Sequence, residues 1–195
     1  MNMNKIAINI FLLIGIAFTS IAQDKKFNLV LVAGMNASQV NGDKLAGFDK
    51  IGLITGAGIN RQVNKKLAWQ FEILYAEKGS KDVASASNIQ LDTLFKFNYI
   101  EIPLMVNYTI YDKLQLQGGI YTGVRVKAVY DDYVISFDRT NLIRSLDHGL
   151  CIGVNYSITE HWKANIRVSQ SVLDINNTFE RYYNLSSALS IRYQL

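Results

Sequence analysis

The sequence of 195 residues contains one proline, one cysteine and two histidines. A single cysteine excludes an intramolecular disulfide. Cys151, His148 and His161 form no ligand cluster, so we expect neither a metal nor another cofactor. The net charge of +4 comes without a basic patch interleaved with aromatic residues, which argues against a nucleic-acid partner.

The chain has only one long apolar run, and it lies at the start. A short basic segment, MNMNK, precedes IAINIFLLIGIAF and then the small residues of TSIAQ. This order predicts a signal peptide over residues 1–22, cleaved after Ala22, followed by one domain over 23–195. The alternative is a membrane anchor helix, but the run is short and no basic stop-transfer cluster follows it. No later stretch approaches 18 consecutive apolar residues, so we expect no transmembrane helix.

Apolar residues alternate with small or polar residues in eight later segments. Such a period of two is typical of β-strands whose two faces meet different surroundings. The predicted strands cover 27–38, 51–63, 67–79, 98–110, 114–128, 147–158, 162–172 and 184–195. Short connections (64–66, 110–113, 159–161) alternate with long ones (39–50, 80–93, 129–146, 173–184). The pattern predicts an all-β fold, an eight-stranded antiparallel up-and-down transmembrane β-barrel with three short periplasmic turns and four longer extracellular loops.

Alternation alone does not say which face of the barrel points inward, and a soluble lipocalin-like barrel is the competing fold. Eight glycines fall on the polar face, where they suit a narrow lumen: Gly34, Gly52, Gly56, Gly58, Gly119, Gly123, Gly149 and Gly153. Five aromatic residues on the apolar face lie near the short turns or the C-terminus: Trp69, Tyr108, Tyr156, Trp162 and Tyr193. They predict an aromatic belt at the periplasmic interface and therefore favour the membrane barrel.

The segment NYIEIPLMVNYTI (98–110) places Glu101 and Pro103 inside an apolar strand. Both have the parity of the polar face, so we expect both to point into the lumen. The same parity and depth predict a salt-bridge network of Glu72, Glu101, Arg167 and Arg192, because bidentate carboxylate–guanidinium pairs leave neither charge unpaired. Pro103 lacks an N–H, which predicts a bulge or a missing ladder bond.

Three basic residues, Lys78, Arg125 and Lys127, fall near the ends of strands that lead into long loops. They predict a basic extracellular rim that attracts anions, including the phosphates of lipopolysaccharide. The lumen of an eight-stranded barrel is normally filled by side chains, although a narrow pore is an alternative. The loop over 128–145 can extend as strand above the membrane or form a partner-binding edge.

Five motifs occur in order along the chain: GMNAS (34–38), LYAEKGS (74–80), NYIEIPLMV (98–106), GGIYTGV (118–124) and DHGLCIGV (147–154). Together they resemble the PorT-like outer-membrane β-barrel family of Bacteroidetes. The resemblance implies a barrel similar in architecture to OmpA and OmpX, located in the outer membrane. It also implies a link to protein secretion, with which the founding member is associated. From the residues we expect a non-enzymatic structural, surface-interaction or secretion-accessory role, with outer-membrane lipid, lipopolysaccharide and an envelope or secretion-machinery protein as partners.

Two catalytic interpretations are weaker. GAGINR (56–61) begins like a dinucleotide-binding loop but lacks its third glycine and the helix that should follow. A small lipid-A-modifying barrel would need a serine and a histidine near the outer leaflet. Asp147 and His148 lie there, but the serine would have to be Ser145 or Ser136 from a loop.

Overall fold

The computed structural model describes residues 27–42, 47–81, 94–131, 136–138, 143–176 and 181–195. The predicted signal peptide lies outside these residues. Within them, no helix has the length and apolarity that crossing a membrane requires.

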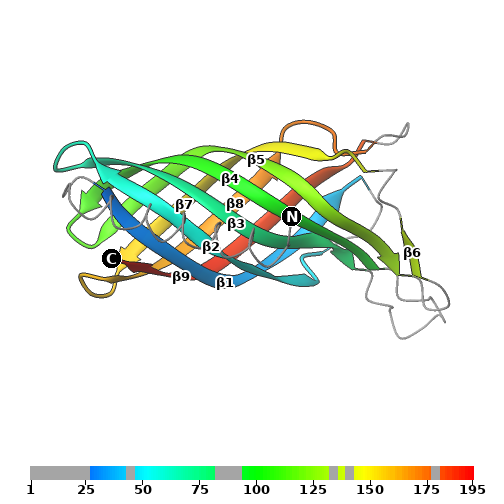
Figure 1. Ribbon diagram of the computed structural model, residues 1–195, viewed down its shortest axis with the longest axis horizontal. Helices are drawn as coiled ribbons and strands as arrows, with labels where there is room; N and C mark the ends of the chain where they lie inside the picture. Colours follow the sequence, from blue (N-terminus) through cyan, green and yellow to red (C-terminus); the bar gives the residue numbers. More distant parts are fainter. Residues whose placement is uncertain (1–26, 43–46, 82–93, 132–135, 139–142, 177–180) are drawn as a thin grey trace, which may run out of the picture.

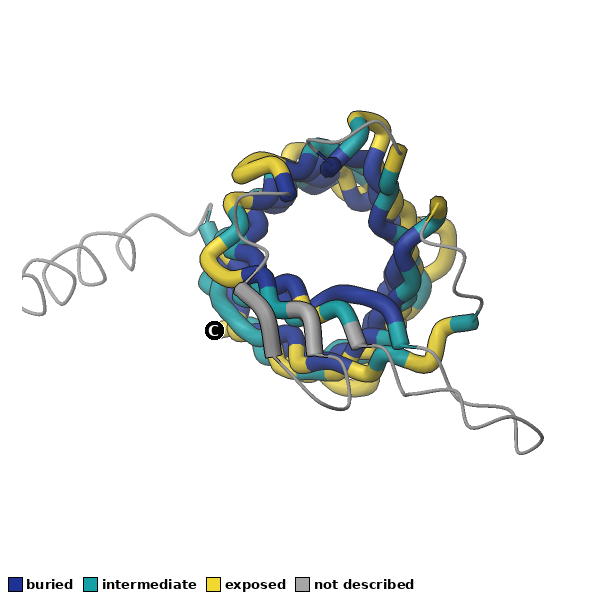
Figure 2. The backbone as a smooth tube through the Cα atoms, turned by 90° about the vertical axis from the view of Figure 1, so that its right-hand side faces the viewer, coloured by how far each residue is buried: buried dark blue, intermediate teal, exposed yellow. Residues whose placement is uncertain are grey.

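The described chain is a closed antiparallel barrel (Figures 1 and 2). Its strands are β1 (Phe27–Asn41), β2 (Lys50–Gln62), β3 (Leu67–Lys81), β4 (Leu94–Tyr111), β5 (Leu114–Asp131), β7 (Leu146–Ser157), β8 (Trp162–Ser171) and β9 (Tyr183–Gln194). A short strand, β6 (Ser136–Asp138), extends the sheet beside β5. The hydrogen-bonded order is β4-β3-β2-β1-β9-β8-β7-β5, and pairing of β4 with β5 closes the ring. The predicted eight-stranded fold is therefore confirmed.

Short turns join the strands at one end of the barrel, which we call the turn end. Asn64 begins the turn between β2 and β3, where its Oδ1 accepts the backbone N–H groups of Lys66 and Leu67 at 2.9 Å. Thr159 does the same between β7 and β8, because its Oγ1 accepts the N–H of Trp162 at 3.0 Å. Side chains that bond their own backbone in this way favour turns over continued strand.

At the opposite end, the loop end, the strands run further than the sequence predicts. β3 continues to Lys81, and β4 begins at Leu94 instead of at 98. β5 continues to Asp131 and pairs with β6, so the expected extension of the 128–145 hairpin as strand is present. The sheet on the β3–β6 side therefore projects beyond the rest of the ring, as Figure 1 shows.

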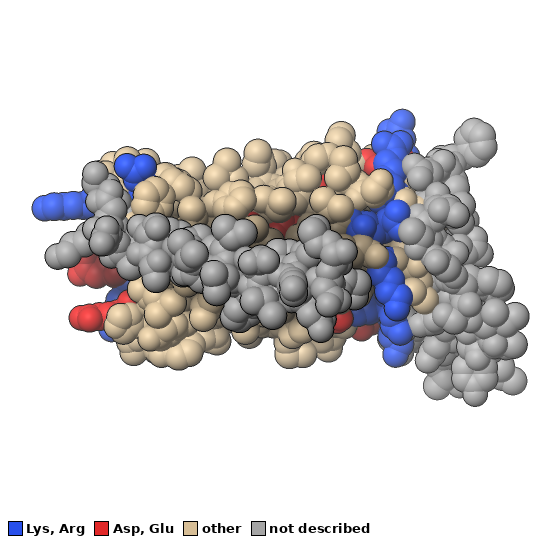
Figure 3. Space-filling view, in the orientation of Figure 1, with Lys and Arg blue, Asp and Glu red and all other residues tan. Residues whose placement is uncertain are grey.

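The two faces of the strands differ as the alternation predicts. Large apolar side chains on the outer face are exposed, for example Met35 at 59%, Ile152 at 67% and Leu189 at 61%. Figure 3 shows mostly uncharged side chains on the described part of the visible outer surface between the two ends. Buried side chains on the inner face are mostly polar or small. An apolar outer surface around a polar interior is the arrangement of a barrel whose solvent is lipid.

Three irregularities mark β4 and β5. The β3–β4 register is unbroken, but the hydrogen-bonded pairing is missing at two positions, where Glu72 lies opposite Pro103 and Ile73 lies opposite Ile102. The missing N–H of Pro103 therefore interrupts the ladder without a bulge. The β4–β5 register shifts at two other places. Tyr99 pairs with Arg125 and Asn98 with Lys127, which leaves Val126 as an extra residue of β5, whereas Thr109 pairs with Gln115 and Tyr111 with Leu114, which leaves Ile110 as an extra residue of β4 at the turn end. An extra residue reverses the facing of every residue that follows it in the strand.

Candidate functional site

A charged layer crosses the interior about midway along β3. The Glu72 carboxylate lies between two guanidinium groups, accepting a hydrogen bond from Arg167 Nη1 at 2.9 Å and another from Arg192 Nη1. The exposed fractions of these side chains are 0%, 4% and 3%. β3 and β8 are four steps apart around the ring in either direction, so the Glu72–Arg167 pair spans the full width of the barrel.

Amide side chains complete this layer toward the turn end. Gln117 Oε1 accepts from Arg167 Nη2 at 2.9 Å, and Gln117 Nε2 donates to Asn107 Oδ1 at 2.8 Å. Asn165 Oδ1 accepts from Arg192 Nη2 at 3.1 Å, which ties β8 to β9. We call this set the polar layer: Gln70, Glu72, Asn107, Gln117, Asn155, Asn165, Arg167 and Arg192. Every member is buried, so the hydrogen bonds replace water as partners of these groups.

Glu101 belongs to a second cluster and not to the network predicted for it. The strand register sets Glu101 opposite Leu74, between the levels of Glu72 and Lys78. Its carboxylate pairs with the Lys78 ammonium, whose Nζ also lies 3.8 Å from Asp147 Oδ2. Arg167 and Arg192 both form ion pairs with Glu72, and Lys78 is the cation that pairs with Glu101.

The second cluster lies on the loop-end side of the polar layer and includes two tyrosines. Asp147 accepts hydrogen bonds from Ser171 Oγ at 2.7 Å and from Asn184 Nδ2 at 2.9 Å. The Lys78 ammonium lies 4.5 Å from the ring centroid of Tyr121 and 5.8 Å from that of Tyr99. We call this set the lysine cluster: Lys78, Tyr99, Glu101, Tyr121, Asp147, Ser171 and Asn184.

Glycines provide the room for the tyrosine rings. A Cβ atom built on Gly149 would lie 2.3 Å from Cε1 of Tyr121 and 2.3 Å from the backbone oxygen of Gln170. A Cβ on Gly123 would lie 3.2 Å from the ring of Tyr99. These two inward glycines therefore set how closely the rings of the lysine cluster approach the barrel wall.

Gly149→Ala should lower the free energy of unfolding by about 1–3 kcal/mol, because the new methyl group overlaps both a ring and a backbone atom. Urea unfolding in lipid vesicles measures the change. Gly118→Ala is the matched control, since no atom lies within 4 Å of a Cβ built there. Equal effects of the two substitutions would contradict the packing role of Gly149.

Apolar side chains cover the lysine cluster at the loop end. Phe97 of β4, Ile143 before β7 and Ile175 after β8 are between 0% and 4% exposed. A backbone hydrogen bond from Arg144 N to Ile175 O joins these two connecting segments, and another from Ile175 N to Tyr182 O lies within the connection between β8 and β9. We call this group the apolar cap: Val40, Phe97, Ala128, Ile143 and Ile175.

The predicted basic rim is not a single group. Lys78 is 1% exposed and belongs to the lysine cluster. The bulge at Val126 turns Lys127 to the outer surface, where it is exposed, while Arg125 Nε donates to the backbone oxygen of Arg144 at 3.2 Å. Other basic residues at strand ends complete a band near the loop end, which Figure 3 shows as a blue stripe. We call it the basic band: Lys50, Lys81, Lys96, Arg125, Lys127, Arg144 and Arg181.

The five aromatic residues predicted as a belt all lie toward the turn end. Tyr108, Tyr156 and Trp162 are exposed on the outer face at 46–49%. The ring centroids of Trp162 on β8 and Tyr193 on β9 lie 4.8 Å apart. Trp69 packs edge-on against Phe27, with 5.9 Å between the ring centroids. Amphipathic rings at one level of an apolar surface are typical of a membrane interface.

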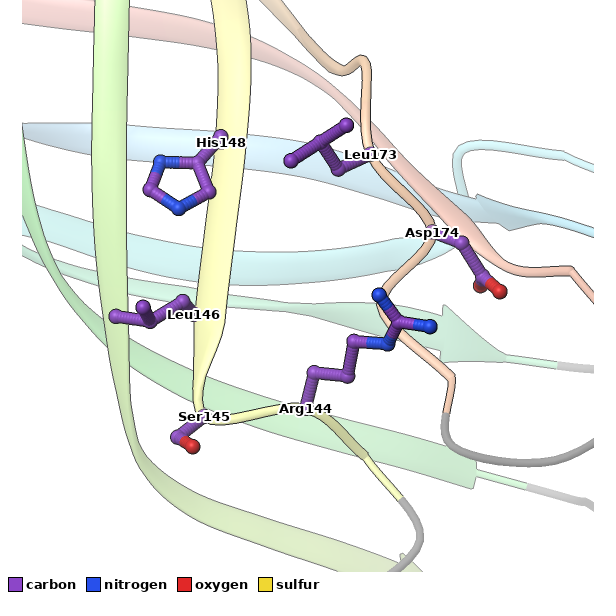
Figure 4. Close-up of a pocket in the computed structure, with 6 residues that line it drawn as sticks. All are labelled: Arg144, Ser145, Leu146, His148, Leu173 and Asp174. Atoms are coloured by element: carbon purple, nitrogen blue, oxygen red, sulfur yellow. The ribbon is translucent and has the colours of Figure 1, made fainter.

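An amphipathic pocket of about 350 Å³ lies on the outer surface at the loop end, lined by Arg144, Ser145, Leu146, His148, Leu173 and Asp174 (Figure 4). His148 Nδ1 lies 3.1 Å from Thr122 Oγ1 of the neighbouring strand. Asp147 is buried inside the barrel, whereas His148 faces outward. The pair considered for lipid-A chemistry is therefore divided by the barrel wall.

The residues described by the structure contain no group of three or more histidine, cysteine or acidic side chains arranged to hold a metal ion. The sequence did not identify the tyrosines and Asp147 as partners of Lys78. Their inward parity was available as a signal, but parity gives the face of a strand and not the depth at which long side chains meet.

Comparison with known proteins agrees with this architecture. The structure resembles that of Ail, the attachment invasion locus protein of Yersinia pestis, with a TM-score of 0.53 and 15% identity over 87% of this chain and 99% of that one. It also resembles Neisserial surface protein A, with a TM-score of 0.56 and 14% identity over 87% and 97%. At these identities the similarity shows a shared fold alone. No curated protein sequence matches the chain.

The family model for the outer membrane protein beta-barrel domain matches residues 14–177. That match covers most of the sequence, and it agrees with the closed eight-stranded ring, the apolar outer face and the buried polar interior. The chain therefore belongs to the outer membrane protein beta-barrel domain family.

Proposed function

We propose that the protein is a non-enzymatic outer-membrane barrel with a plugged lumen, which acts through its extracellular face in surface interaction, envelope structure or secretion. The observation that carries this proposal is the Glu72–Arg167 pair, because it joins strands on opposite sides of the ring. A second contact of the same kind, between Asn184 Nδ2 and Tyr99 OH at 3.4 Å, joins β9 to β4 in the lysine cluster.

Three successive levels of side chains support a closed interior. The polar layer lies toward the periplasm, the lysine cluster lies beyond it, and the apolar cap covers the extracellular end. A hydrated ion crossing the barrel would have to separate buried ion pairs, which costs several kcal/mol when one partner is left alone. Function is then left to the extracellular loops and to the outer surface.

The proposed partners follow from charge and position. The basic band lies at the extracellular edge of the apolar surface, where lipopolysaccharide carries its phosphates. The hairpin of β5 and β6 offers an edge for an envelope or secretion-machinery protein. The sequence motif Tyr-x-Glu-Ile-Pro-Leu over 99–104 supports a PorT-like assignment, and residues 1–22 support export through a signal peptide.

The folded protein should show no discrete current steps in planar bilayers. The same refolded sample, reconstituted in liposomes, should admit no small sugars in a swelling assay, whereas a known porin should. Retention of the folded, heat-modifiable form on unheated gels checks that the inserted protein is native. Reproducible conductance by this folded form would overturn the plugged-lumen proposal.

A further inference from the structure

The outer pocket combines an apolar floor with polar groups at its loop end. Leu146 and Leu173 are 48% and 53% exposed, and they continue the lipid-facing surface that includes Leu150. Arg144, Ser145 and Asp174 line the same pocket where the strands pass into the loops. Its volume of about 350 Å³ lies within the range of small-molecule sites. A molecule that fills it must carry an apolar chain and a polar head, as a membrane lipid does.

The charges of the pocket specify the polar head further. Arg144 Nε donates to the backbone oxygen of Asn176 at 3.1 Å, which fixes the guanidinium and leaves its Nη1 and Nη2 donors without a hydrogen-bond partner among the described residues. Asp174 Oδ1 accepts the N–H groups of Asn176 and Tyr182 at 2.9 Å, which leaves Oδ2 as an acceptor. Figure 4 shows the guanidinium beside Asp174. The pocket thus offers cationic donors and an anionic acceptor next to each other.

The carboxylate of Asp174 would repel a simple anion bound to the guanidinium. The guanidinium of Arg144 would likewise repel a simple cation bound to the carboxylate. We propose that the pocket binds a phosphoethanolamine headgroup, with its phosphate on Arg144 and its ammonium on Asp174. A primary ammonium has three N–H donors for the carboxylate, whereas the quaternary ammonium of choline has none. The acyl chain lies along Leu146 and Leu173.

His148 supplies a further polar group on the wall of the pocket. When Thr122 Oγ1 donates its proton to His148 Nδ1, the imidazole carries its own proton on Nε2. That N–H is a donor on the β5 side of the pocket, whereas the Arg144 guanidinium lies on the other side of β7 (Figure 4). Thr122 is a positioning residue in this arrangement, since it orients the ring through the bond of 3.1 Å and does not line the pocket.

Native mass spectrometry of the folded full chain tests the proposal with lipids of identical acyl chains. Phosphatidylethanolamine should form a bound adduct at about tenfold lower concentration than phosphatidylglycerol or phosphatidylcholine, the factor that corresponds to about 1.4 kcal/mol. A second comparison measures the binding of lipid A with and without a phosphoethanolamine substituent. Stronger binding of the substituted lipid A than of phosphatidylethanolamine would identify lipopolysaccharide as the source, and the reverse would identify a phospholipid.

Two variants separate the roles within the site. Asp174→Asn keeps the Oδ1 acceptor for the loop but removes the charge, so it should abolish the preference for phosphatidylethanolamine over phosphatidylglycerol. Arg144→Gln should weaken the binding of all three phospholipids by about tenfold, since each of them carries the phosphate. Lys65→Gln removes the same charge from an exposed residue of the turn between β2 and β3, outside both the pocket and the basic band, and should change nothing.

Equal binding of the three phospholipids would overturn the proposal, and so would a preference that survives in Asp174→Asn. Tighter binding of phosphatidylglycerol would overturn it in favour of a simple anion site. The inference goes beyond the plugged lumen and does not depend on it, because a conducting barrel would leave the outer pocket unchanged.

Discussion

Glu72→Gln is expected to lower the free energy of unfolding by about 3–5 kcal/mol, the cost typical of removing one partner from a buried ion pair. The substitution keeps the shape of the side chain but leaves the guanidinium groups of Arg167 and Arg192 without a counter-charge. Both side chains are at least 96% buried, so water cannot replace the carboxylate. Urea titration in lipid vesicles, followed by the fluorescence of Trp69 and Trp162, measures the change.

The control for this prediction is Glu160→Gln. Glu160 is exposed in the turn between β7 and β8, so its substitution should change the free energy of unfolding by no more than about 0.5 kcal/mol. If Glu72→Gln shifts the urea midpoint no more than this control does, then the polar layer does not stabilise the barrel.

Lys78→Met should destabilise the barrel by a similar amount, about 3–5 kcal/mol. The lysine supplies the cation for Glu101 and lies 3.8 Å from Asp147, so its loss leaves two buried carboxylates without a counter-ion. The double substitution Lys78→Met with Glu101→Gln should recover part of the loss, because one of the two uncompensated charges is then absent. Melting temperatures and urea midpoints of the single and double variants give the coupling energy.

Lys127→Met is the matched control, because the Lys127 side chain is exposed on the outer surface at the same end of the barrel. It should leave the urea midpoint nearly unchanged. Single-variant losses that simply add in the double variant would refute the Lys78–Glu101 pair, since coupled partners give a double variant more stable than the sum.

The alternation of side chains was enough to predict the barrel and much of its interior. Leu67, Phe71 and Ile73 face outward while Gln70 and Glu72 face inward because successive residues of a strand point to opposite sides. The same rule, applied to β8 and β9, placed Arg167 and Arg192 inside, where the structure sets both against Glu72. Alternation is local, so it can be read without knowing how the strands pair.

The partners of Glu101 and the position of Lys127 were not predictable in this way. The depth at which inward side chains of two strands meet depends on the strand register, and the register between β3 and β4, which no short turn fixes, sets Glu101 between Glu72 and Lys78. The bulge at Val126 reverses the parity of Lys127, and the alternation before it carries no sign of this change. The outer pocket likewise needs the approach of two loops distant in sequence, at Arg144 and Asp174.

The sequence by itself therefore determined the number of strands, the face that each side chain takes and the end at which the long loops lie, because these depend on local periodicity and connection length. Closure of the ring decided which charges pair across the interior and which groups gather on the outer surface. The physical reason is that ion pairs and pockets depend on distances across the barrel, and only the complete set of strand registers defines those distances.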